Sequence, residues 1–162
     1  MNIGEIEERI GYSFQNADHL RRALTSTSFA KEHNDRIHSS SKKRLLDYGG
    51  LATLGDAVLD TIIAEELMAR GINDKGDISQ IRSQLVREET QFDLWEELGI
   101  ELAQLWITSQ EEHRILSGKK AMFEHLFEAL VGAVFLDGGY DKARERSLAW
   151  YSSHMDRIQH VV

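Results

Sequence analysis

Apolar residues recur at intervals of three and four along most of the chain, the spacing of one face of an α-helix. The clearest run predicts a long, largely buried helix over residues 45–68. Its apolar positions are Leu51, Leu54, Val58, Leu59, Ile62 and Ile63. A second buried helix is predicted over 121–139, closed by Gly138 and Gly139. These two helices are expected to form the centre of the molecule.

Shorter helices are predicted around this pair. One begins at residue 3 and stops near Gly11, and Asn16 is a plausible N-cap for another that continues to residue 30. Asp77 or Ser79 can cap a helix that ends at Gly99. The other expected segments are a polar loop over 31–44 with disorder at 38–43, a short apolar segment over 100–108, a polar loop over 109–120 and an amphipathic helix over 140–158. The pattern predicts a single all-α domain over 1–162.

Composition narrows the class of protein. The chain has 162 residues, 41% of them hydrophobic, which suits one globular domain with a sizeable core. It has no Cys, which excludes disulfides and cysteine metal sites, and no Pro, which favours uninterrupted helices. No apolar run approaches the ~20 residues that cross a bilayer, and the acidic start does not resemble a signal peptide. A cytoplasmic protein without membrane contact is expected.

Charge limits how the chain can bind nucleic acid. The net charge is −8, so the protein is not a generally basic nucleic-acid coat. Any RNA affinity must come from local basic patches, because phosphate contacts rely on Lys and Arg. The candidate phosphate contacts flank the two central helices, and solvated surface charge is the alternative reading of the same residues. They are Lys42, Lys43, Arg44, Lys119 and Lys120.

Five sequence blocks, in order, resemble the nuclease domain of the ribonuclease III family. They are "EERIGYSF", "LRRALTSTSFA", "LGDAVLD", "GDISQIRSQLVREET" and "FEALVGAVFLDGG", and together they extend over nearly the whole chain. The resemblance implies an all-helical ribonuclease III endonuclease-domain fold, a two-fold homodimer, and Mg²⁺-dependent hydrolysis of double-stranded RNA. Many members add a double-stranded-RNA-binding domain, which is not expected within this chain.

The same resemblance indicates the metal ligands. The family uses a Glu and an Asp four residues apart on one helix, and an Asp and a Glu three residues apart on another. Asp56 and Glu128 match two of these four positions, whereas Ala52 and His125 stand at the other two. Imidazole suits Mn²⁺ better than Mg²⁺, so His125 is a weaker candidate ligand that could change the metal. Weak binding of Mg²⁺ or Mn²⁺, and slow or absent cleavage, are expected.

Each candidate also has a structural reading. Asp56 could be a buried acid paired with an Arg, and His125 a hydrogen-bonded structural residue. Asp60 is read as a solvated helix acid, although it could replace a missing ligand, and Glu124 is not assigned to the site. Three further interpretations concern packing. Gly55 and Gly132 are expected to allow close contact between helices, and the aromatic residues Phe123, Phe127 and Phe135 are expected to belong to the core. Thr53 stands where the family has an aromatic residue that packs across the dimer.

Two functional hypotheses follow from the sequence. The first is a divergent, metal-dependent endoribonuclease that acts on double-stranded or structured RNA. The second is a catalytically inactive dimer of the same fold that binds RNA or a protein partner. The family resemblance and the two retained carboxylates favour the first hypothesis, while Ala52 and His125 favour the second.

Overall fold

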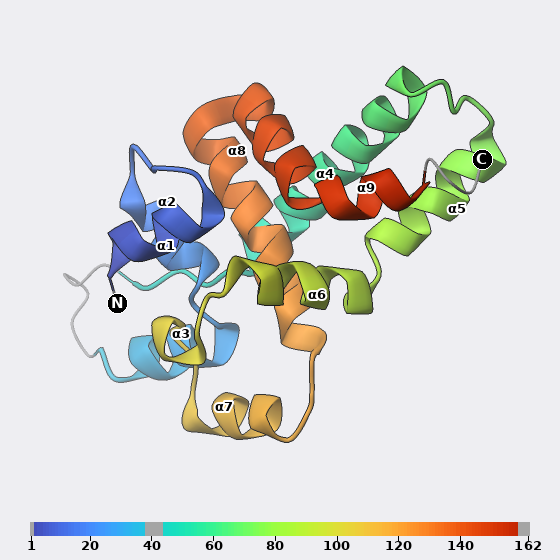
Figure 1. Ribbon diagram of the computed structural model, residues 1–162. Coiled ribbons are helices and arrows are strands. Elements are labelled where there is room, and N and C mark those ends of the chain that lie inside the picture. The colour runs from blue at the N-terminus through green and yellow to red at the C-terminus, as the bar shows by residue number, and fades with distance from the viewer. Residues whose placement is uncertain (1, 38–43, 159–162) are drawn as a thin grey trace.

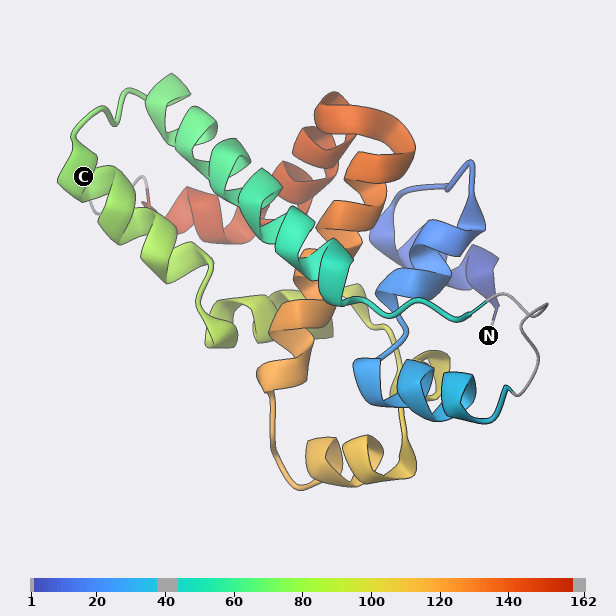
Figure 2. The same ribbon diagram turned by 180° about the vertical axis from the view of Figure 1, so that it is seen from behind.

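The computed structural model describes residues 2–37 and 44–158, most of which lie in helices (Figures 1 and 2). The first three are α1 (Ile3–Ile10), α2 (Ala17–Ala23) and α3 (Thr27–Asp35). They are followed by α4 (Gly49–Ala69), α5 (Lys75–Leu85), α6 (Glu88–Leu98) and the short 3-10 helix η1 (Leu102–Gln104). The last three are α7 (Ser109–Leu116), α8 (Ala121–Trp150) and α9 (Ser152–Ile158). The prediction of an all-α fold is confirmed over the described residues.

Helices α4 and α8 form the centre of the fold, and α2 and α6 pack against α8 on either side (Figure 1). The predicted apolar faces account for this arrangement, because Leu59, Ile62 and Ile63 of α4 and Phe127 of α8 are fully buried. The predicted core role is also confirmed for Phe123, which is buried. The apolar side chains of α4 and α8 that face each other therefore form the centre of the core.

Several helix ends follow the signals predicted from the sequence. Gly11 closes α1 with a left-handed backbone at φ 70°, and the Asn16 side chain accepts a hydrogen bond from the Asp18 N–H. Gly139 interrupts α8 with φ 80° and ψ −176°, so the helix is kinked where the predicted 121–139 helix ends. Gly99 closes α6 in the same left-handed conformation as Gly11. These glycine and asparagine predictions are confirmed.

Three predicted segments are wrong in their extent. The predicted helix over 16–30 is divided into α2 and α3, because the chain between them forms an isolated bridge from Thr25 to Trp106. The predicted helix over 78–99 is divided into α5 and α6, and α5 begins earlier, after an Asp74 cap that accepts from the Gly76 and Asp77 N–H groups. The predicted long helix over 45–68 begins only at Gly49.

The two predicted polar loops are also corrected. Residues 109–116 form α7, whose start is fixed by a capping box in which Thr108 and Glu111 satisfy each other's backbone N–H groups. The predicted loop over 31–44 is helical in α3 as far as Asp35, and residues 38–43 lie outside the described residues. In the part of the chain that the structure describes, no helix is long and apolar enough to cross a membrane.

Candidate functional site

The site between α4 and α8 depends on two glycines at the helix crossing. A Cβ atom on Gly55 would overlap the backbone carbonyl oxygen of Glu128, and one on Gly132 would overlap that of Leu51. The two backbones therefore approach more closely than any side chain would allow, as the sequence predicted for Gly55 and Gly132. This approach places Asp56, the residue after Gly55, near Glu128.

Glu128 is an acid in an unfavourable environment. Its side chain is buried, with only 8% of the residue exposed. Burial is the main cause that raises its pKa from 4.5 to about 7, and the negative charges of Asp56 and Glu124 add to the rise. Asp56 itself is exposed. One carboxylate is therefore open to solvent, and its neighbour retains a proton at a pH where Glu is normally charged.

Behind Glu128 lies a small buried polar cluster formed by Gln91 of α6 and Tyr151, which follows α8. Gln91 is fully buried, and neither its amide nitrogen nor its amide oxygen reaches a hydrogen-bond partner among the described residues. The Gln91 amide still lowers the pKa of the Glu128 carboxyl through its proximity. Burial raises the pKa of Tyr151, whose hydroxyl also lacks a hydrogen-bond partner within the described chain. The inner side of Glu128 is therefore polar but weakly bonded.

Two further carboxylates influence Glu128. Glu124 is one turn before it on α8, and Asp60 is one turn after Asp56 on α4; both raise the pKa of Glu128. The interpretation of Asp60 as a solvated acid is wrong, because Asp60 is half-buried and forms an ion pair with Arg82 of α5. One Asp60 oxygen remains buried without a hydrogen-bond partner among the described residues. The charges that act on Glu128 therefore come from neighbouring acids on both central helices.

The two changed positions have other roles. Ala52 is buried at 4% exposure within the core formed by α4 and its neighbours. His125 is exposed, and its ring stacks on Tyr48 with ring centroids 6.0 Å apart and planes 13° from parallel. In residues 2–37 and 44–158, no three His, Asp or Glu side chains are grouped closely enough to hold a metal ion. The structure thus brings together Asp56 and Glu128, and it places His125 against Tyr48.

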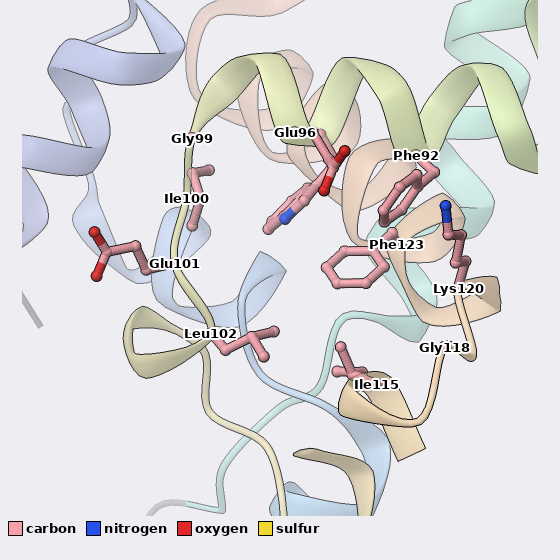
Figure 3. Close-up of a pocket in the computed structure, with 11 residues that line it drawn as sticks. Phe92, Glu96, Gly99, Ile100, Glu101, Leu102, Ile115, Gly118, Lys120 and Phe123 are labelled. Atoms are coloured by element: carbon pink, nitrogen blue, oxygen red, sulfur yellow. The ribbon is translucent and has the colours of Figure 1, made fainter. Parts of the chain in front are cut away.

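The lysines that were predicted to contact phosphate do not form one patch among the described residues. Lys42 and Lys43 lie outside the described residues, and Lys119 is exposed. The Lys120 ammonium group is 3.6 Å from the centre of the Phe92 ring, at the rim of a hollow of about 480 Å³ (Figure 3). This hollow is lined largely by aromatic and aliphatic side chains from α6, η1 and the start of α8. It is separate from the acidic cluster, since it includes neither Asp56 nor Glu128.

A sequence model of proteins described as ribonuclease-III-like matches residues 16–154. The chain belongs to the ribonuclease-III-like family. Ribonuclease 3 of Ectopseudomonas mendocina is 34% identical over an alignment of 161 residues that covers 97% of this chain and 62% of that protein. Ribonuclease 3 of Bdellovibrio bacteriovorus is 38% identical over an alignment of 144 residues that covers 86% of this chain and 56% of that protein. The ribonuclease-III-like chain therefore spans less than two thirds of the length of these relatives.

The fold agrees with this family. Two solved structures of the nuclease domain of ribonuclease III from Campylobacter jejuni match with TM-scores of 0.76 and 0.74, at 26% and 27% sequence identity. The matches cover 94% of this chain, and 97% and 95% of the two Campylobacter chains. The predicted family and the predicted nuclease-domain fold are both confirmed. The roles of individual ribonuclease-III-like site residues remain predictions.

Sequence reasoning missed part of the surroundings of Glu128. Gln91 could have been found from its spacing, because it lies three, four and seven residues before the buried Leu94, Trp95 and Leu98 and so shares their face of α6. Glu124 could have been found from its spacing, since residues four apart share a helix face. The partner of Asp60, Arg82, lies on another helix and has no signal in the local sequence.

Proposed function

We propose that this chain is a nuclease domain that hydrolyses phosphodiester bonds of double-stranded RNA with a divalent cation. Asp56 and Glu128 are the proposed cation-binding residues. The observation that best supports this assignment is their placement on facing helices, near enough for the charge of Asp56 to raise the pKa of Glu128. Membership of the ribonuclease-III-like family supports the reaction class.

The two carboxylates fit a cation held partly by water rather than one enclosed by protein. No group of three possible ligands exists among the described residues. Mg²⁺ commonly keeps several waters and takes one or two carboxylates together with substrate phosphates, so Asp56 and Glu128 are sufficient for this mode. A cation would also favour the charged form of Glu128, which burial and neighbouring acids disfavour. Mn²⁺ is the alternative ion, and His125 could become a third ligand only by leaving its stacking position on Tyr48.

When bound, such a cation polarises the phosphodiester and lowers the pKa of an attacking water. Asp56 is exposed, so it can meet an incoming cation or a hydrated phosphate directly. Glu128 is buried between the helices, so its position is fixed before substrate arrives. Without a cation a substantial fraction of the Glu128 carboxyl is protonated near neutral pH, since its pKa is about 7, and cation binding would release that proton.

The second candidate function is a non-catalytic module that binds RNA or a protein partner. Two observations favour it. Ala52 is a core residue, and the His125 ring packs on Tyr48, so the two changed positions serve packing in this conformation. The proposed activity is accordingly slower than that of a site with four carboxylates.

We also propose that the domain acts as a cytoplasmic homodimer that buries at least ~1,000 Å² in total. The description of one Campylobacter structure refers to a region involved in dimer formation. Thr53 is exposed in the single chain, as a residue at an interface would be. Sedimentation at micromolar concentration tests this assembly, and a strictly monomeric mass would contradict it. Lys42, Lys43, Lys119 and Lys120 remain proposed RNA contacts.

The cleavage proposal is tested with an end-labelled RNA duplex in Mg²⁺ and in Mn²⁺. Asp56→Asn and Glu128→Gln are expected to lower the rate by at least about tenfold, because each removes a charged ligand of the cation. Asp141→Asn is the matched control, since Asp141 is an exposed acid on the far part of α8. A parent protein that binds the duplex but cleaves it in neither metal supports the non-catalytic module instead. Equal activity of all four proteins would remove Asp56 and Glu128 from the site.

A further inference from the structure

A second pocket, of about 370 Å³, lies between α2, α3 and the segment that leads into α4. Its lining is rich in groups that carry or can accept positive charge. Arg21, Arg22, Arg44, His19 and His33 contribute to it, against a single carboxylate, Asp18. In a chain with a net charge of −8, this concentration of cationic groups is the reverse of the overall balance. The pocket therefore has the charge of an anion-binding site.

The walls of this pocket are fixed by hydrogen bonds. The Asn34 side chain binds both the N–H and the carbonyl of Leu45, at 2.8 and 2.9 Å, and so holds the segment after Arg44 against α3. Trp106 is held by backbone bonds in both directions: its N–H donates to the Leu24 carbonyl at 2.9 Å, and its carbonyl accepts from the Ser26 N–H at 2.8 Å. The cationic side chains thus project from a defined frame.

The arginines of this pocket differ in how many of their guanidinium N–H donors already have a partner in the protein. Arg21 is paired with Asp18 at 2.9 Å on the surface, where such pairs contribute little. Arg22 donates through Nε to the Asp47 carbonyl at 3.0 Å, and its Nη2 lies against Gly50 in the first turn of α4. Neither Arg22 nor Arg44 has a carboxylate partner within the described residues. Both retain donors for an external anion.

The position of the pocket links it to the proposed cleavage site. Arg22 lies beside the first turn of α4, and Asp56 is about 10 Å further along the same helix at ~1.5 Å per residue. Duplex DNA carries one phosphate charge per about 1.7 Å of axis, and duplex RNA is comparably dense. A duplex with one phosphodiester at Asp56 therefore has other phosphates within reach of this end of α4.

We infer that the pocket formed around Arg21, Arg22 and Arg44 is a phosphate-binding subsite for the backbone of duplex RNA. Guanidinium groups suit this role because their planar donors can bind two phosphate oxygens at once. The subsite would offset the repulsion between RNA and the acids around Glu128. This inference rests on the proposed function, since it assigns the subsite to the same RNA that Asp56 and Glu128 would cleave.

The test measures binding of a fluorescent RNA duplex without divalent metal, over a range of salt concentrations. The variant is Arg21→Ala combined with Arg44→Ala, because both side chains are exposed and their removal leaves the core intact. Arg157→Ala is the control: it removes one charge from exposed α9, away from the pocket. The double variant is expected to bind at least about tenfold more weakly, with the log–log salt slope reduced by about two. The control is expected to keep the parent's slope.

A third protein, Arg44→Lys, separates charge from general structure. It keeps the positive charge but loses the planar donor pair, so its affinity is expected between those of the parent and the double variant. If the double variant binds with the parent's affinity and salt slope, the inferred subsite is wrong. This result would not affect the proposed cleavage by Asp56 and Glu128, which has its own assay. If the parent binds no duplex even at low salt, both the subsite and the proposed RNA substrate are overturned.

Discussion

Replacing Glu128 by Gln is expected to stabilise the metal-free protein at neutral and alkaline pH. The folded state holds the pKa of Glu128 at about 7, against an ordinary value of 4.5. In the unfolded chain this carboxyl loses its proton near pH 4.5, whereas in the folded chain it keeps the proton until about pH 7. Between these values the unfolded state binds fewer protons, so the free energy of unfolding falls as pH rises.

The size of the effect follows from the same shift. A pKa difference of this size corresponds to a loss of about 3 kcal/mol between pH 4.5 and pH 7. The amide introduced by Glu128→Gln carries no charge at any pH and can still approach the Gln91 amide. The Glu128→Gln protein should therefore match the parent near pH 4.5 and exceed it by about 2–3 kcal/mol at pH 8.

Urea unfolding followed by tryptophan fluorescence in EDTA measures this difference at several pH values. Asp141→Asn is the control, because it removes an exposed acid from the same helix and should keep the parent's pH dependence. Parallel curves for Glu128→Gln and the parent over the whole range would refute the reasoning. They would mean that the Glu128 carboxyl is not disfavoured by burial and neighbouring charge.

Two further variants, a double substitution and a single one with its own control, test the central helix pair. Ala52→Glu combined with His125→Asp should increase cleavage of duplex RNA in Mg²⁺, and should lower stability without metal because four close acids repel each other. Added Mg²⁺ should restore the stability, as measured by thermal unfolding. If Mg²⁺ increases neither the cleavage rate nor the stability of this variant, the interpretation of a depleted metal site is contradicted. Gly55→Ala should destabilise the fold by about 3 kcal/mol, because its Cβ would overlap the Glu128 carbonyl, whereas Gly4→Ala should change stability by less than about 1 kcal/mol in the same urea assay.

The sequence predicted the central helix pair because its signals are local and periodic. The buried faces of α4 and α8 follow the helical repeat, and the small residues Gly55 and Gly132 on those faces are by themselves a sign of close helix contact. Helix breaks were harder to find. The chain turns between Leu85 and Glu88 without Gly or Pro, so tertiary packing, rather than a local breaker, separates α5 from α6.

In polar segments the error was the reverse, because a helix was predicted as a loop. Helix α7 has few apolar residues and was predicted as a loop, although Thr108 and Glu111 carry the spacing of a capping box. The candidate metal pair was available from motifs, since Asp56 and Glu128 each lie in a recognisable block. The basic pocket could not be predicted from motifs, because Arg21, Arg44 and His33 come from three separate segments that only the fold brings together.

The central claim is that Asp56 and Glu128 hold one divalent cation between α4 and α8. Anomalous diffraction from crystals soaked in Mn²⁺ at neutral to slightly alkaline pH tests it most directly, because Mn²⁺ scatters anomalously and accepts the same oxygen ligands as Mg²⁺. The account predicts a peak within about 2–2.5 Å of an oxygen of each carboxylate in the parent, and its loss in Asp56→Asn. A well-occupied peak elsewhere, or none between these residues at saturating Mn²⁺, would contradict the account.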